Sequence, residues 1–202
     1  MDAAHWDDAY GRLGAHGVSW ARGDAGPSLD LLEVAAASAE SAIDVGGGAS
    51  PFAAALLDRG IADVTVLDIS PVAIDAGRAA LGDRAREVQW VTADIREWQP
   101  DRTWGLWHDR AVFHFMVTEA ERAAYRRALA SALEPGGHVI AAAFAPDGPE
   151  QCSRLPVRRY GAADLVAALG DDLVLLEERR EVHVTPAGVE QPFTWVLARR
   201  TG

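Results

Sequence analysis

The chain has 202 residues, of which 49% are hydrophobic and 24% charged, and its net charge is −11. These values indicate one globular domain with a hydrophobic core, exclude wholesale disorder, and argue against a nucleic acid or an anionic membrane as the main partner, because either would favour a basic surface. The single cysteine, Cys152, excludes an intrachain disulfide, and without a secretory signal or a membrane-spanning run we expect a cytoplasmic protein, either a monomer or a homodimer.

Strand and helix patterns alternate through the first two thirds of the chain. Short apolar or β-branched runs are followed by helical segments, two of which begin with Ser-Pro. Such a β-α rhythm with short links predicts a parallel sheet with helices on both faces. The expected strands are 41–45, 63–69, 87–95, 104–109 and 138–144, and the expected helices are 50–60, 70–81 and 118–133.

The last third of the chain breaks this alternation. A helix is expected at 161–170, followed by strands at 172–185 and 192–200. The six residues between these strands are too few for a parallel crossover, so the two strands should pair antiparallel. The sequence therefore predicts an α/β fold with a doubly wound, mostly parallel seven-stranded sheet that ends in a C-terminal antiparallel hairpin. No long linker divides the chain, and we expect a single domain over residues 1–202.

Three consecutive glycines, Gly46 to Gly48, follow the first expected strand in the stretch IDVGGGAS. In open α/β sheets, ligands bind at the carboxyl edge where the strand order reverses. A dinucleotide-binding G-x-G-x-x-G motif would need glycine or alanine where Pro51 stands, and a phosphate-binding loop would need a lysine, which the chain lacks. Asp44, just before the glycines, would repel a pyrophosphate and instead suits a ligand with an ammonium group and hydroxyls.

Two further carboxylates stand at the ends of the next two expected strands. Asp68 ends the second strand, where such a residue can accept hydrogen bonds from both hydroxyls of a ribose. Asp94 ends the third, where it would meet an adenine amino group. Each carboxylate alone also fits a helix cap or a solvated side chain. Three of them in register with the glycines form a more specific pattern.

These motifs resemble those of the class I S-adenosylmethionine-dependent methyltransferases. IDVGGGAS is similar to their first motif, VTVLDIS to the second, VTADIREW to the third, and ALEPGGHVIAAAF to the segment that enters the fifth strand. The resemblance covers roughly residues 40–200 and departs from the family pattern at Ser50, where a third glycine is usual. It implies S-adenosylmethionine as cofactor and S-adenosylhomocysteine as product.

The resemblance also implies which residues bind the cofactor. The glycines would let its amino-acid end lie against the backbone. Asp44, Gly46, Gly47 and Gly48 would hold the methionine portion, Asp68 with its neighbour Ile69 the ribose, and Asp94 with the Ile95 amide the adenine. Asp109 is expected to contact the amino-acid end by its backbone or by its carboxylate.

The stretch WHDRAVFHFM, after the fourth expected strand, should line the acceptor side. A sulfonium methyl is already activated, so the protein mainly aligns the acceptor and excludes water. If the acceptor loses a proton, His114 is the candidate base because histidine titrates near neutrality, and a packing role is the alternative. Arg110 and Phe113 are expected at the acceptor, with a pair between Arg110 and Asp109 as the alternative for the arginine.

The N-terminal stretch HWDDAYGRLGAHGVSW is rich in aromatic residues and is similar to the lid of smaller family members. Residues 1–40 would then be a helical lid over a cofactor-binding and catalytic core at 41–202. Tyr10 and Trp20 are expected at the cofactor, whose sulfonium an aromatic face attracts, and Trp6 at the acceptor. The plain alternative is that these aromatic side chains only pack the first helix onto the sheet.

The segment 145–160 is long for a connection, and such loops are often functional. Its Arg154 and Arg158 would attract an anionic acceptor, or would simply be solvated. No spacing of His, Cys and Asp indicates a metal site. A short chain without an added recognition domain favours a small-molecule acceptor. The alternatives are a protein lysine methyltransferase and a non-enzymatic cofactor-binding regulator.

Overall fold

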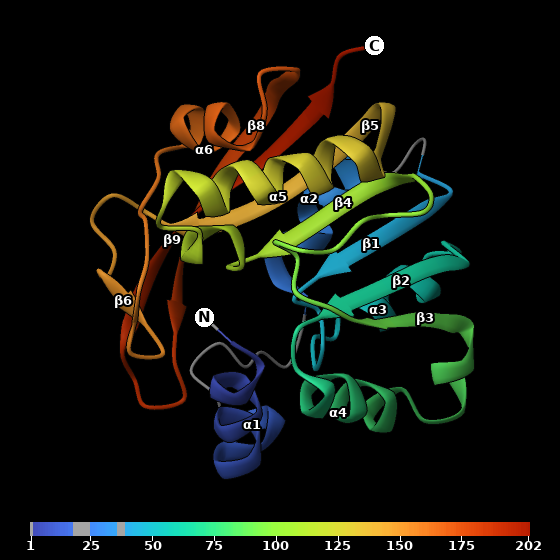
Figure 1. Cartoon of the computed structure of the whole chain (residues 1–202), viewed down its shortest axis with the longest axis vertical. Coiled ribbons are helices and arrows are strands. Elements are labelled where there is room, and N and C mark those ends of the chain that lie inside the picture. Colours follow the sequence, from blue (N-terminus) through green and yellow to red (C-terminus); the bar gives the residue numbers. More distant parts are fainter. Residues whose placement is uncertain (1, 18–24, 36–38) are drawn as a thin grey trace.

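The computed structural model describes residues 2–17, 25–35 and 39–202. Its centre is one seven-stranded sheet with the strand order β3-β2-β1-β4-β5-β9-β8 (Figure 1). The neighbouring pairs from β3 to β5 are parallel, whereas β9 is antiparallel to both β5 and β8. The expected doubly wound sheet with a C-terminal antiparallel hairpin is confirmed.

The bounds of the elements are as follows. The strands of the sheet are β1 (Ser41–Val45), β2 (Asp63–Asp68), β3 (Val88–Thr92), β4 (Trp104–Arg110), β5 (Leu133–Phe144), β8 (Leu173–Val184) and β9 (Glu190–Arg200), and β6 (Gln151–Cys152) with β7 (Leu155–Pro156) forms a small separate hairpin. The helices are α1 (Ala3–Gly17), α2 (Gly26–Ala35), α3 (Phe52–Asp58), α4 (Pro71–Leu81), α5 (Glu119–Ala132) and α6 (Ala162–Leu169).

Helices cover both faces of the sheet, as expected. In Figure 1, α5 and α6 lie on one face and α2 and α3 on the other. α4 packs against β2 and β3, and α1 packs against α4. Sequence signals explain where two of them begin: the Ser70 hydroxyl caps α4 by accepting from the Ala73 N–H, and Thr118 with Glu121 forms a capping box at the start of α5.

The structure differs from the expected elements in a few places. β3 ends at Thr92, so Asp94 lies in the turn after the strand instead of at its end. β5 begins directly after α5, and residues 134–137 loop out opposite Gly105 before the regular pairing resumes. The β6–β7 hairpin was not expected from the sequence.

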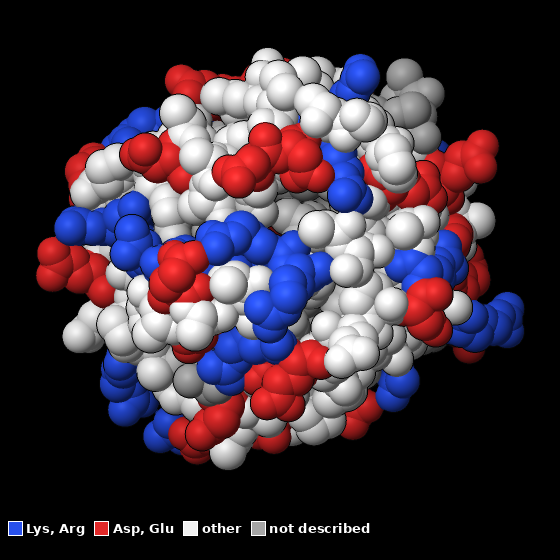
Figure 2. All heavy atoms as spheres, turned by 45° about the horizontal axis from the view of Figure 1, so that its top comes forward, with Lys and Arg blue, Asp and Glu red and all other residues white. Residues whose placement is uncertain are grey.

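Charged side chains of both signs are interspersed on the face shown in Figure 2. Many arginines in the described part of the chain are paired with acidic neighbours. Arg122 and Arg126 both contact Glu119 on α5, and Arg200 of β9 contacts Asp172. Exposed ion pairs of this kind contribute little to stability, so these contacts mainly offset the excess of negative charge locally.

α4 approaches the loop between β1 and α3 without a side chain in between. Gly77 lies inside α4, where glycine is unfavourable for a helix. A Cβ on Gly77 would overlap the carbonyl oxygen of Gly48 and lie 3.0 Å from the Trp90 ring. Gly77 therefore sets how closely α4 packs against the loop that contains Gly46 to Gly48, called the glycine loop below.

Replacing Gly77 with alanine should destabilise the protein by about 2–3 kcal/mol, because a backbone carbonyl cannot move aside as a flexible side chain can. The matched control is Gly11→Ala on α1, where a Cβ would have no atom within 4 Å. That change should leave the free energy of unfolding unchanged or slightly raised. Denaturant unfolding measures both, and equal stability of the two variants would contradict the close approach.

Candidate functional site

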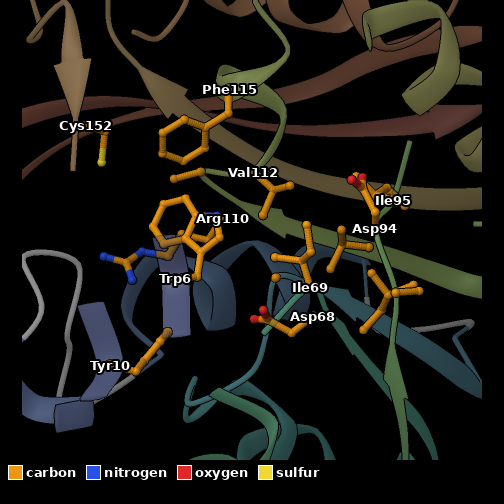
Figure 3. Close-up of a pocket in the computed structure, with 15 residues that line it drawn as sticks. Trp6, Tyr10, Asp68, Ile69, Asp94, Ile95, Arg110, Val112, Phe115 and Cys152 are labelled. Carbon is orange, nitrogen blue, oxygen red and sulfur yellow. The ribbon is translucent and has the colours of Figure 1, made fainter. Parts of the chain in front are cut away.

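A cavity opens at the carboxyl edge of the sheet between β1 and β4, where the strand order reverses. The space between its walls measures about 700 Å³ when the open solvent at its mouth is counted. Figure 3 shows Asp68, Ile69, Asp94 and Ile95 on one side of it and Trp6, Arg110 and Cys152 on the other. The full lining is Trp6, Tyr10, Val45, Gly46, Leu67, Asp68, Ile69, Ala93, Asp94, Ile95, Arg110, Ala111, Val112, Phe115 and Cys152.

The three glycines after β1 are needed mainly because their neighbours in the protein come so close. A Cβ on Gly46 would overlap the Val112 side chain, and one on Gly47 would overlap the Asp44 carboxylate. Gly46 also has a positive φ of 69°, a conformation that favours glycine. We expected these glycines because they let the cofactor approach the backbone. The structure adds a second reason, which is tight packing within the protein itself.

Asp68, at the end of β2, is held from the backbone on both of its carboxylate oxygens. Oδ2 accepts from the Gly48 N–H at 3.1 Å, and Oδ1 accepts from the Ser70 N–H at 2.9 Å. Burial raises the pKa of Asp68 to about 6, against the opposing effect of these two donors. Each oxygen keeps a further lone pair, so the carboxylate can accept two more hydrogen bonds from a ligand in the cavity.

Asp94 and Ile95, in the turn after β3, extend the same side of the cavity. The Arg96 guanidinium binds the Asp94 carboxylate, with Nε 2.9 Å from Oδ1. Burial alone would raise the pKa of Asp94, but the hydrogen bonds and charge of Arg96 outweigh it, and the pKa is lowered. This carboxylate is therefore ionised at neutral pH, and Arg96 fixes its orientation.

Asp44 does not line the cavity, although Val45 and Gly46 after it do. Its Oδ1 lies 2.6 Å from Nδ1 of His108, the residue opposite it on β4. Its Oδ2 is buried and has no hydrogen-bond partner among the residues that the structure describes. The carboxylate therefore lies under Gly47 with one oxygen hydrogen-bonded and the other buried without a donor.

Asp109 is expected at the amino-acid end of the cofactor. Its carboxylate forms hydrogen bonds within the protein. Its Oδ1 accepts from the Val112 N–H at 2.7 Å, and its Oδ2 accepts from the Phe113 N–H at 2.9 Å and from the Tyr125 hydroxyl. The side chain is fully buried, and burial raises its pKa to about 6. Asp109 thus shapes the turn after β4, in which Ala111 lines the cavity with a φ of 69°.

The opposite wall of the cavity combines a cation with aromatic and sulfur-containing side chains. Arg110, at the end of β4, and Cys152, in the β6–β7 hairpin, both line it. Burial raises the pKa of the Cys152 thiol to about 11, so the thiol is neutral at pH 7. Trp6 of α1 lies edge-on to Phe115 with 5.2 Å between the ring centroids, which closes this wall.

α1 is held at the cavity by one further polar contact. The Ser70 hydroxyl at the start of α4 donates to Oδ1 of Asp7 at 2.6 Å. Tyr10, one turn after Trp6, is buried against Ala73 of α4 and lines the cavity. These contacts hold the first helix beside the cavity. Trp20 lies outside the described residues.

His114 lies in the core instead of at the cavity, and the expected role as a general base does not fit. Its side chain is fully buried, and its ring contacts Phe115 and Phe144 edge-on. Burial lowers its pKa to about 3, so it is a weak proton acceptor at pH 7. Phe113 is likewise buried, against Tyr125 and Tyr160, and does not reach the cavity.

Arg154 and Arg158 also lie away from the cavity. Both are exposed, and the Arg158 guanidinium lies over the Tyr160 ring at 5.7 Å from its centroid. Sequence reasoning missed Val112, Phe115 and the cavity-facing position of Cys152. Phe115 belongs to the same stretch as Arg110, so the sequence indicated that it lies near the site. The direction of its side chain, however, could not be predicted from the sequence.

Two negative findings apply to the part of the chain that the structure describes. No group of three or more His, Cys, Asp or Glu residues there has the geometry to bind a metal ion. No helix within the described ranges is both long enough and apolar enough to span a membrane.

Three solved structures of low sequence identity share the whole fold. One belongs to a study of the conversion of a disulfide bond into a thioacetal group during echinomycin biosynthesis, with 21% identity, a TM-score of 0.76, and coverage of 98% of this chain and 93% of that one. The Burkholderia thailandensis 1,6-didemethyltoxoflavin-N1-methyltransferase, with its substrate and S-adenosylhomocysteine bound, has 19% identity, a TM-score of 0.71, and coverage of 99% and 84%. The Bradyrhizobium japonicum N-methyltransferase NodS, in complex with S-adenosylhomocysteine, has 17% identity, a TM-score of 0.69, and coverage of 97% and 98%.

The sequence itself matches a family model described as a methyltransferase domain over residues 42–137. This range begins in β1, contains Asp68, Asp94 and Arg110 of the cavity, and ends in β5. The match assigns a methyltransferase domain to residues 42–137, and the fold shared along the whole chain is the Rossmann-like fold of the class I S-adenosylmethionine-dependent methyltransferases.

Proposed function

We propose that the protein transfers the methyl group of S-adenosylmethionine to a small molecule that carries an anionic group. The observation that carries the proposal is the form of the cavity. Trp6 and Tyr10 of α1 and Cys152 of the β6–β7 hairpin enclose a limited space above the sheet edge, next to Arg110. The Burkholderia neighbour of the same fold binds 1,6-didemethyltoxoflavin, which lends support from outside the chain.

The residues present fit the cofactor on chemical grounds. S-adenosylmethionine carries a ribose diol, an adenine and an amino-acid end with an ammonium group. Asp68 offers two oxygens with free lone pairs for the diol, and Asp94 with the Ile95 amide offers an acceptor and a donor for the adenine. For the ammonium, the buried Oδ2 of Asp44 under Gly47 has the matching charge.

The chain would contribute mainly orientation and the exclusion of water. The bound cofactor supplies a methyl group that its sulfonium already activates. The apolar lining of Val112, Phe115 and Trp6 would keep water from the reacting centre and orient the acceptor. An aromatic ring such as Trp6 also favours a nearby positive charge.

On the wall formed by Trp6, Arg110 and Cys152, the ionisable groups are Arg110 and the neutral Cys152 thiol, so this wall offers no ready proton acceptor. We infer that the acceptor atom arrives without a proton to lose, as an ionised oxygen or sulfur or as a neutral nitrogen with a free lone pair. Arg110 would stabilise an anionic group on such a molecule by a charge-assisted hydrogen bond. His114, Arg154 and Arg158 have no part in this proposal.

The domain division expected from the sequence also belongs to the proposal. Residues 1–40 would act as a lid on a core at 41–202. The contact of Asp7 with Ser70 would attach that lid to the start of α4, and the contact of Trp6 with Phe115 would attach it to the cavity wall.

Incubation with methyl-labelled S-adenosylmethionine and a cell extract, separated afterwards into small molecules and proteins, tests the acceptor class. Label should appear among the small molecules. Arg110→Met should lower that transfer by about tenfold or more, since a charge-assisted hydrogen bond is lost, while the affinity for S-adenosylhomocysteine stays unchanged. Arg127→Gln, on the exposed side of α5, is the control. Label confined to proteins would contradict the proposal.

Asp68→Ala should weaken the binding of S-adenosylhomocysteine by about 10–100-fold, because a buried carboxylate that accepts from a diol is worth about 1.5–3 kcal/mol. Asp75→Ala removes an exposed carboxylate from the neighbouring helix α4 and should bind like the unmodified protein. Titration calorimetry measures both. Unchanged affinity in the Asp68 variant would remove this residue from the site.

The affinity for S-adenosylhomocysteine should also fall as the pH drops. The diol needs the ionised form of Asp68, whose pKa in the free protein is raised to about 6, so binding is strong above pH 6 and is lost below it. Between pH 7.5 and 5 the dissociation constant should rise about tenfold. Asp68→Asn should bind weakly with a nearly flat profile, and any slope that remains would come from other groups such as Asp109. A steep profile that survives in Asp68→Asn would show that Asp68 is not responsible.

A further inference from the structure

Beneath the glycine loop, three polar side chains from three elements form one continuous chain of hydrogen bonds. His108 of β4 lies opposite Asp44 of β1 in the parallel register, with Nδ1 2.6 Å from Oδ1. On the other side of the ring, Nε2 lies 2.9 Å from the hydroxyl of Ser28 in α2. The exposed fraction is 1% for Asp44, 1% for His108 and 2% for Ser28.

The imidazole ring has little freedom to turn. It stacks on Phe52 of α3 with 3.9 Å between the centroids and an angle of 29° between the planes. Because Nδ1 faces a carboxylate, Nδ1 carries a hydrogen and donates it to Oδ1, while the Ser28 hydroxyl is the partner of Nε2. The ring thus holds one oxygen of the Asp44 carboxylate in a fixed direction.

The charges around His108 come from few elements. Asp44 faces it from β1, and Asp109 follows it on β4. The neighbours from the other packed elements are uncharged: Ser28 from α2, Phe52 from α3, and Ile140 opposite His108 on β5. Of these neighbours, Asp44 is the charged group to which the ring is hydrogen-bonded.

The second oxygen of Asp44 is the part of this arrangement that lacks a partner. Oδ2 is buried without a hydrogen bond among the described residues, and it lies so close to Gly47 that a Cβ there would overlap it. A buried carboxylate oxygen with no donor is unfavourable unless a cation or donor joins it. The arrangement is therefore complete only when a positively charged group reaches the underside of the glycine loop.

We propose that His108 is a positioning residue for the amino-acid end of the cofactor. It acts through Asp44: the Nδ1–H bond orients the carboxylate so that Oδ2 receives the ammonium group, and the Ser28 contact ties that orientation to α2. This inference rests on the proposed function. It gives a role to His108, to which the family resemblance assigns none. It also predicts that α2, through Ser28, affects how the amino-acid end of the cofactor is bound.

Two ligands separate this role from a general contribution to packing. S-adenosylhomocysteine carries the ammonium, whereas 5′-methylthioadenosine has the same adenosine and sulfur but no amino-acid end. A positioning role through Asp44 changes the affinity for the first ligand only. A structural role in the core changes both affinities together.

Two substitutions separate the nitrogens of the ring. In His108→Asn the amide nitrogen stands near the place of Nδ1 and can still donate to Asp44, whereas in His108→Gln it stands near the place of Nε2 and reaches toward Ser28. His108→Gln should weaken the binding of S-adenosylhomocysteine by about tenfold or more, the usual effect of losing a residue that orients a ligand-binding group. Its affinity for 5′-methylthioadenosine should stay within about twofold of the unmodified protein. His108→Asn should restore most of the loss.

Titration calorimetry with both ligands, together with thermal unfolding of each variant, gives the answer. Parallel loss of both ligands in His108→Gln, or equal binding of S-adenosylhomocysteine by all forms, would overturn the inference. If neither variant folds, the Nδ1–H proton resonance of His108 in the unmodified protein decides: it should shift with S-adenosylhomocysteine and not with 5′-methylthioadenosine, and the same response to both would overturn it. Failure of the unmodified protein to bind S-adenosylhomocysteine at all would instead contradict the proposed function.

Discussion

The close approach of the glycine loop to its neighbours is the constraint on which the cavity depends. Gly46, Gly47 and Gly48 each lack the Cβ that would overlap a side chain of the surrounding structure, and Gly77 of α4 lacks the one that would push the helix away. Because interiors pack at near-crystalline density, a single added methyl group at such a point shifts a backbone segment. The loop, α4 and the turn after β4 are therefore fixed relative to one another, and the polar groups they carry converge on one edge of the sheet.

The three buried carboxylates near this edge differ in how many hydrogen bonds each accepts from the protein. Asp109 accepts three hydrogen bonds from its own turn and from Tyr125, and its fully buried side chain does not line the cavity. Asp68 accepts one backbone N–H on each oxygen and keeps capacity on both. Asp44 is bound on one oxygen only. Burying a carboxylate oxygen without a hydrogen-bond donor is costly. The number of oxygens that can still accept a hydrogen bond therefore distinguishes a carboxylate with a structural role from one that can bind a ligand.

The sequence predicted the fold far better than it predicted the directions of side chains. Strand and helix periods, the Ser-Pro starts of α3 and α4 and the short link before β9 are local signals, so the sheet and its hairpin followed from them. Whether a residue of the turn after β4 faces the cavity depends on tertiary packing: Arg110 does, whereas His114, four residues later, turns into the core. The partnership of His108 with Asp44 needs the register between strands 64 residues apart, which no local pattern contains.

Both N-terminal helices reach a carboxylate of the site through one intermediate residue. α1 contacts Ser70 through Asp7, and the N–H of Ser70 donates to Asp68. α2 contacts His108 through Ser28, and His108 binds Asp44. Each path is a short run of directional hydrogen bonds in a buried setting, where such bonds are stronger than in water. A ligand that fixes Asp68 and Asp44 in their ionised, oriented forms would therefore favour the docked positions of both helices, and by thermodynamic linkage the docked helices would favour the ligand to the same extent.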